Sequence, residues 1–184
     1  LVCAAARPRG LADDLAALAD VGGLDLSALG DRLRHRVTFA RLAPTDLVGP
    51  EVAGPAIAQA DPAPTTFTAT APVAIAGPVT AIAVSFVATL APGVELSSAV
   101  GATATHWVQT VFPLEPALVA AAGDELAIEL TPRVVFERAT WTWTVRTAAE
   151  VRAMDAVDAL IGERDDLLAQ LGVRRPGPLP APTA

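Results

Sequence analysis

Short segments in which apolar and polar residues alternate dominate this chain between residues 66 and 145. The clearest is residues 140–145, where Trp141, Trp143 and Val145 share one face and three threonines share the other. A period of two residues in such side chains is typical of a strand with one buried face. Strands of the same kind are expected at 66–70, 82–87, 107–112 and 126–130. Many short strands separated by Gly- and Pro-containing turns favour a β-barrel or a β-sandwich.

The first 64 residues carry a more mixed pattern. Residues 1–6 form an apolar run that predicts a short buried strand. Over 11–19 the apolar residues recur at helical spacing, and residues 35–42 predict a further strand. Residues 44–64 are rich in proline, glycine and alanine, which favours an extended connection with short strand pieces.

The pattern becomes helical over residues 147–172. Thr147-Ala148-Ala149-Glu150 has the form of a capping box, whose hydroxyl and carboxylate accept hydrogen bonds from the first N–H groups of a helix. An apolar stripe follows from Val151 to Leu171, and Gly172 is a typical C-terminal stop. This amphipathic helix either pairs with a partner helix or folds back on its own domain. Residues 173–184 form a proline-rich tail that is expected to be disordered.

Composition and charge narrow the classes of function. The chain has 184 residues, enough for one domain, and its net charge of −7 argues against nucleic-acid binding, which needs a basic surface. Its longest apolar run, 80–90, is too short to span a membrane, and no charged segment typical of a secretory signal precedes residues 1–6. We therefore expect a cytoplasmic protein that does not enter the membrane. The single cysteine, Cys3, predicts a buried apolar residue, because it can form neither an intramolecular disulfide nor a thiolate metal site alone.

The most distinctive segment is Thr105-His106-Trp107-Val108-Gln109-Thr110-Val111-Phe112, followed by the turn Gly123-Asp124-Glu125. Upstream lies Gly23-Leu24-Asp25-Leu26-Ser27. In this order and spacing the segments resemble the protein arginine methyltransferase family, which carries a Thr-His-Trp loop, a Gln-Thr-Val-Phe-like strand, a Gly-Asp/Glu turn and a Gly-Phe-Asp-Met-Ser stretch. The resemblance extends over residues 1–145 and is most specific at 105–112.

The resemblance implies a mainly β fold, a β-barrel or sandwich-like domain over residues 1–146. A short helical dimerisation arm is inserted at 11–42, and the C-terminal amphipathic helix follows the barrel. The arm would make a homodimer by packing on the partner subunit, with apolar contacts from Leu24, Leu26 and Leu29.

The resemblance also implies a pocket for a protein or peptide arginine at the Thr-His-Trp loop. His106 would be a catalytic residue of the pocket, hydrogen-bonded to a carboxylate of another domain. Thr105 and Trp107 would line the substrate channel. An aromatic wall suits a guanidinium, because the ring quadrupole attracts a flat cation. The implied reaction is methyl transfer from S-adenosyl-L-methionine (SAM) to a guanidinium nitrogen.

The SAM-binding half of such an enzyme is missing from this sequence. A cofactor domain begins with a strand, a glycine-rich turn and a helix, and no such pattern is present. The family's pair of arginine-binding glutamates would also lie upstream of Leu1. We therefore expect the chain to be inactive without a SAM-binding domain, which is either missing from a fragment or a separate polypeptide.

The other candidate residues have simpler structural interpretations. Trp141 and Trp143 are expected in the barrel core, and Glu150 at a helix cap. His35 and the pair Asp165-Asp166 are expected on solvated faces. An alternative function is a non-catalytic binding or assembly barrel derived from the same family, whose C-terminal helix carries the main interaction.

Overall fold

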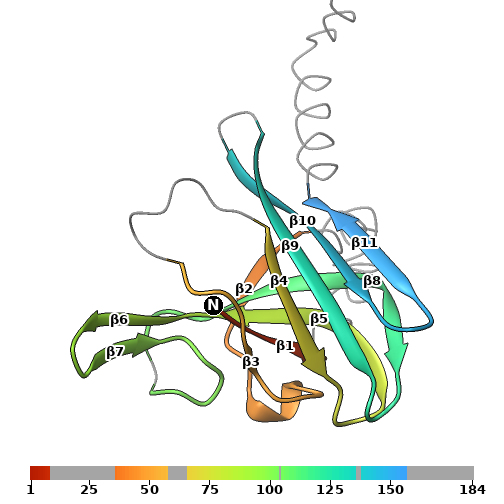
Figure 1. Ribbon diagram of the computed structural model, residues 1–184, viewed down its shortest axis with the longest axis horizontal. Coiled ribbons are helices and arrows are strands. Elements are labelled where there is room, and N and C mark those ends of the chain that lie inside the picture. Colours follow the sequence, from red (N-terminus) through yellow and green to blue (C-terminus); the bar gives the residue numbers. More distant parts are fainter. Residues whose placement is uncertain (9–35, 58–65, 104, 136–137, 157–184) are drawn as a thin grey trace, which may run out of the picture.

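The described part of the chain forms antiparallel β-sheets (Figure 1). The computed structural model describes residues 1–8, 36–57, 66–103, 105–135 and 138–156. Its elements are β1 (Val2–Ala6), β2 (Thr38–Ala40), the 3-10 helix η1 (Pro44–Asp46), β3 (Val52–Ala53), β4 (Phe67–Pro72), β5 (Gly77–Ser85), β6 (Val87–Ala91), β7 (Val94–Ser97), β8 (Gln109–Ala120), β9 (Glu125–Val135), β10 (Arg138–Arg146) and β11 (Val151–Asp155). The prediction of a mainly β, barrel- or sandwich-like fold is confirmed.

Two sheets enclose one core. The first has the strand order β2-β8-β5-β1-β3 and the second the order β11-β10-β9-β4. The sheets meet at two edges, where β4 lies against β1 and β3, and β11 lies against β8. The hairpin β6-β7 forms a separate two-stranded sheet that extends away from the others, on the left of Figure 1.

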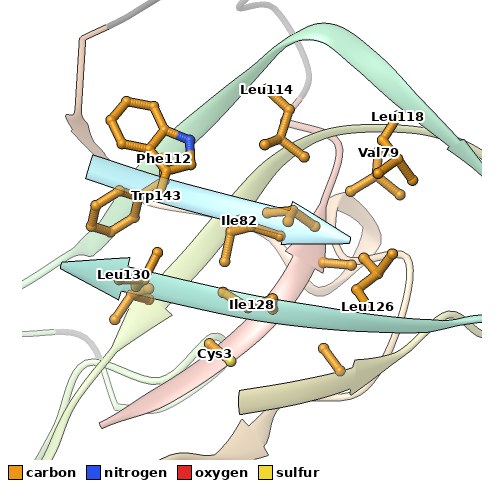
Figure 2. Close-up of a cluster of buried hydrophobic side chains, with 14 of the residues drawn as sticks. Cys3, Val79, Ile82, Phe112, Leu114, Leu118, Leu126, Ile128, Leu130 and Trp143 are labelled. Atoms are coloured by element: carbon orange, nitrogen blue, oxygen red, sulfur yellow. The ribbon is translucent and has the colours of Figure 1, made fainter. Parts of the chain in front are cut away.

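The core contains the apolar face of almost every long strand (Figure 2). Trp143 and Val145 of β10 are buried, as the alternation over residues 140–145 predicts. The Trp143 indole Nε1–H donates a 2.8 Å hydrogen bond to the carbonyl of Pro113, so its one polar atom is satisfied inside the core. Phe112 meets Trp141 and Trp143 edge to face, with ring centroids 5.5 and 5.6 Å apart. Trp143 is therefore a core residue, and the partly buried Trp141 packs against the core, as expected.

The tight fit between β3 and β4 depends on a glycine. A Cβ at Gly54 would lie 2.2 Å from a ring carbon of Phe67, the first residue of β4. Phe67 is buried in the core, so its ring has little freedom to move. Gly54 lets the connection after β3 cross this ring and brings the edges of the two sheets together.

The prediction of a helix starting at residue 147 is wrong for residues 151–155, which form β11 and pair with β10. The Thr147 hydroxyl accepts hydrogen bonds from the N–H groups of Ala149 (3.2 Å) and Glu150 (3.0 Å), and the Thr147 N–H donates to the Glu150 carbonyl. These bonds close the turn of the β10-β11 hairpin. Side-chain hydroxyls satisfy backbone N–H groups in turns as well as at helix starts, so the motif alone does not distinguish the two.

The consequence is a larger barrel than the expected 1–146, because β11 is part of the second sheet. The Glu150 carboxylate forms a 2.9 Å ion pair with Arg152 of β11 and does not cap a helix. The remainder of the expected helix up to 172, the tail 173–184 and residues 11–35 of the expected arm lie outside the described residues. No helix in the described ranges is long and apolar enough to cross a membrane.

Candidate functional site

Thr105, His106 and Trp107 lie together in the loop that leads into β8. The His106 and Trp107 rings are adjacent, with centroids 4.7 Å apart and planes inclined by 38°. His106 is exposed and Trp107 is 48% exposed, an unusual fraction for the largest apolar side chain. The loop thus presents an imidazole and an indole side by side at the surface.

Thr105 shapes this loop through its hydroxyl. The Thr105 Oγ1 accepts a 3.1 Å hydrogen bond from the backbone N–H of Trp107, which is a local side-chain turn. The guanidinium of Arg41 donates to the Thr105 carbonyl from the segment that follows β2. Thr105 is therefore linked both to its own loop and to a distant part of the chain.

Trp107 packs against Phe86, which stands between β5 and β6. The two ring centroids are 5.7 Å apart and the planes are inclined by 84°, an edge-to-face arrangement. Such aromatic pairs contribute about 0.5–1.5 kcal/mol beyond the area they bury. Because Trp107 remains 48% exposed, part of its surface stays open to a flat cation or an apolar partner.

Buried and half-buried polar side chains join the segments around the loop. One carboxylate oxygen of Glu51 accepts hydrogen bonds from the Ser85 hydroxyl (3.1 Å) and the Val100 N–H (3.2 Å). The buried Gln109 side chain bonds to the backbone of Leu42 and Ser98. Sequence reasoning did not assign these supporting residues. Gln109 belongs to the distinctive motif, whereas Glu51 carried no local signal because its partners are distant in the sequence.

The other predicted site residues lie elsewhere. Leu24, Leu26 and Leu29, together with His35 and the pair Asp165-Asp166, fall outside the described residues. Cys3 is buried on β1, as expected, and burial raises the pKa of its thiol to about 11 although the Leu1 amino group opposes the shift. Within the described ranges, no group of three or more His, Cys, Asp or Glu side chains could hold a metal ion.

A second surface feature is an open hollow of about 340 Å³ on the sheet formed by β4, β9 and β10. Ala127 stands between Thr70 and Arg146 in the strand pairing, and its small side chain leaves room there. The hollow belongs to the sheet that does not contain β8, so the Thr105–Trp107 loop takes no part in it.

Comparisons with known proteins show which solved structures this fold resembles. No family model matches the chain, and no curated protein matches it. Its fold is similar to Trypanosoma brucei PRMT1, solved as an enzyme–prozyme heterotetrameric complex with AdoHcy, with a TM-score of 0.67 and 14% identity over 83% of this chain. It is also similar to Arabidopsis thaliana protein arginine methyltransferase 10, with a TM-score of 0.55 and 13% identity over 84% of this chain.

These likenesses define the class of fold: the described sheets have an architecture found in protein arginine methyltransferases. The match spans 55% of the T. brucei chain and 58% of the Arabidopsis chain. The resemblance read from residues 105–112 therefore agrees with the fold.

Proposed function

We propose that this chain is the C-terminal substrate-binding and dimerisation barrel of a SAM-dependent protein arginine N-methyltransferase-like enzyme. In this proposal the Thr105–Trp107 loop forms part of the pocket for the target arginine. The observation that carries the proposal is the exposed His106–Trp107 pair, which lies in the distinctive motif of a chain whose fold is similar to that of protein arginine methyltransferases.

The position of the loop relative to β1 supports this assignment. Val2 pairs with Ser85, and the next residue, Phe86, contacts Trp107. A domain joined ahead of β1 would therefore emerge beside the loop. A pocket between such a domain and the barrel would have His106 and Trp107 on one wall.

The chemistry of the two side chains fits an arginine pocket. The open part of the Trp107 ring can bind a guanidinium through the ring quadrupole, which stabilises a cation by about 0.5–2 kcal/mol depending on desolvation. The exposed His106 imidazole can hydrogen-bond a carboxylate and so fix its orientation toward the guanidinium. Binding and orienting are the roles that the proposal gives to this chain.

The described residues do not fit SAM itself. A nucleotide-containing cofactor is typically held by a parallel strand, a glycine-rich turn and the start of a helix, and the described sheets are antiparallel. The proposal therefore assigns SAM and the arginine-binding carboxylates to a separate domain. The homodimer formed through the arm at 11–42 and the cytoplasmic location stay predictions.

A second candidate function is a non-catalytic assembly barrel. The T. brucei structure is an enzyme–prozyme complex, so a barrel that supports a second chain is a coherent alternative. The exposed apolar residues Val87, Leu90 and Val94 on the β6-β7 hairpin would then be candidates for the contact. The finding that residues 151–155 form β11 removes the start of the helix to which we had assigned this role.

The test is methyl transfer by the completed protein. The first step is to read the DNA upstream of the Leu1 codon for an in-frame SAM-binding domain, and the neighbouring genes for a separate one. The protein assembled with that domain is then assayed with labelled SAM and an arginine-rich peptide. We expect activity from the assembly and a loss of about 10- to 100-fold in kcat/KM for His106→Ala, because misplaced groups cost rates of this order.

The matched control is Val119→Ala, which trims an exposed apolar residue on β8 away from the loop. It should keep full activity. Unchanged kinetics in His106→Ala would contradict the site assignment. An assembly with no methyl transfer to any arginine peptide would favour the assembly barrel.

A further inference from the structure

Gln109 is the first residue of β8 and is only 3% exposed. Both ends of its amide are used. Its Oε1 accepts a 2.8 Å hydrogen bond from the Leu42 N–H, and its Nε2 donates to the Ser98 carbonyl. A buried amide whose oxygen and nitrogen bond to two distant backbone segments sets the distance between them.

The bond to Ser98 leads to Trp107. The Ser98 N–H donates to the Phe86 carbonyl (2.9 Å), and the Ser98 hydroxyl accepts from the Phe86 N–H (3.0 Å). Phe86 is thereby fixed on both sides of its backbone. Its ring is the one that makes the edge-to-face contact with Trp107.

The bond to Leu42 leads to Thr105. Leu42 is next to Arg41, whose guanidinium donates to the Thr105 carbonyl. Thr105 in turn accepts from the Trp107 N–H. The two backbone groups bound by Gln109 are therefore linked to the loop, one through Phe86 to Trp107 and one through Arg41 to Thr105.

We propose that Gln109 is a positioning residue, whose buried amide holds these two supports at the spacing that presents His106 and Trp107 at the surface. It touches neither ring and acts through Phe86 and Arg41. The effect of Gln109 on methyl transfer rests on the proposed function, whereas its effect on the position of the loop does not.

The experiment labels the full chain with 5-fluorotryptophan, so that Trp107, Trp141 and Trp143 give separate fluorine NMR signals. Trp107→Phe identifies the first of these. In Gln109→Met, which keeps the length of the side chain and removes both hydrogen bonds, the Trp107 signal should broaden or move toward the position of a solvent-exposed indole. The signals of the two core tryptophans should stay in place.

The matched control is Leu118→Ala, a core truncation on the same strand and away from the loop. It should lower the denaturation midpoint and leave the Trp107 signal unchanged, which separates positioning from general destabilisation. A Trp107 signal in Gln109→Met that matches the wild type would overturn the inference. If Gln109→Met does not fold, Gln109→Asn decides the same question, since its shorter side chain keeps an amide but cannot reach both the Leu42 N–H and the Ser98 carbonyl.

Kinetics of the completed enzyme distinguish this inference from the proposed function. Gln109→Met should reduce kcat/KM for the arginine peptide about 10-fold or more, by misplacing the loop, and leave the Kd for SAM unchanged. An altered Trp107 signal with unchanged peptide kinetics would instead count against the role of the loop in the arginine pocket. An unaltered signal would refute the positioning role and leave the proposed function standing.

Discussion

Cys3 lies on β1 among the fully buried side chains of the core, where only its neutral thiol is well accommodated (Figure 2). Burial raises the pKa of this thiol from 9.0 to about 11, against the smaller opposing effect of the Leu1 amino group. In the unfolded chain the Cys3 thiol releases its proton at the lower pKa. The stability that the folded protein has with a neutral, buried Cys3 is therefore fully present below pH 9. It is lost as the pH rises from about 9 to 11.

The expected result is a fall of about 2 kcal/mol in the free energy of unfolding between pH 9 and pH 11, from a shift of about two pKa units. The sequence contains no tyrosine and no lysine, so Cys3 is the side chain that titrates in this window. Urea unfolding at a series of pH values measures the effect. Cys3→Ala serves as the control and should show a flat profile over the same range; parallel profiles for the two proteins would contradict the assignment.

At the scale of the element, β11 shows how one motif serves two structures. Thr147 starts the four-residue turn of the β10-β11 hairpin, and its hydroxyl accepts two backbone N–H groups. Pairing with β10 places Met154 opposite Trp143, and Met154 is buried in the core. This burial and the ladder of backbone hydrogen bonds favour a strand where the local apolar spacing favours a helix.

Thr147→Ala should therefore weaken a hairpin. The expected cost is about 1 kcal/mol, since two backbone N–H groups at a partly exposed turn lose their acceptor. Hydrogen exchange followed by NMR should show faster exchange at the amides of β11 and of the turn, with the far-UV circular dichroism still that of a β protein. Thr66→Ala, which removes an exposed hydroxyl contact with Thr131 on another strand pair, should leave β11 exchange unchanged. A loss of helical signal in Thr147→Ala would restore the helix interpretation.

At the scale of the whole molecule, two antiparallel sheets share one core and leave the Thr105–Trp107 loop exposed at the surface. The match to the solved methyltransferase structures covers most of this chain and little more than half of theirs. A division of labour follows from the proposed function, in which the barrel contributes a pocket wall and another domain binds SAM.

This division predicts that the chain alone does not bind SAM or AdoHcy. Isothermal titration calorimetry of the 184-residue chain should show no binding heat with either ligand, while the assembly with its SAM-binding domain should bind both. The physical reason is that the described antiparallel strands offer no helix start or glycine-rich turn for the nucleotide. Micromolar binding by the chain alone would contradict the division.

Much of the strand content was predictable because alternation is a local property. Trp143 and Val145 are buried where the two-residue period places them, and β1 coincides with the first apolar run. The segment at 107–112 was predicted only in part. The strand begins at Gln109, which leaves Trp107 in the loop, and continues to Ala120 through two prolines that usually interrupt a sheet.

The sequence by itself determined the class of fold and the apolar face of the main strands, because these depend on residues close together in the chain. The Thr-His-Trp loop was expected only from the resemblance to the methyltransferase family. Only the tertiary structure decided that residues 151–155 become β11, and that Arg41, Phe86 and Gln109 support the loop. Both depend on contacts between segments tens of residues apart. The Thr147 hydroxyl can accept backbone N–H groups in a turn or at a helix start, and the Gln109 amide can bond to many backbone groups. The local sequence does not say which partners these side chains have. The partners are selected by the pairing of strands and the burial of the core.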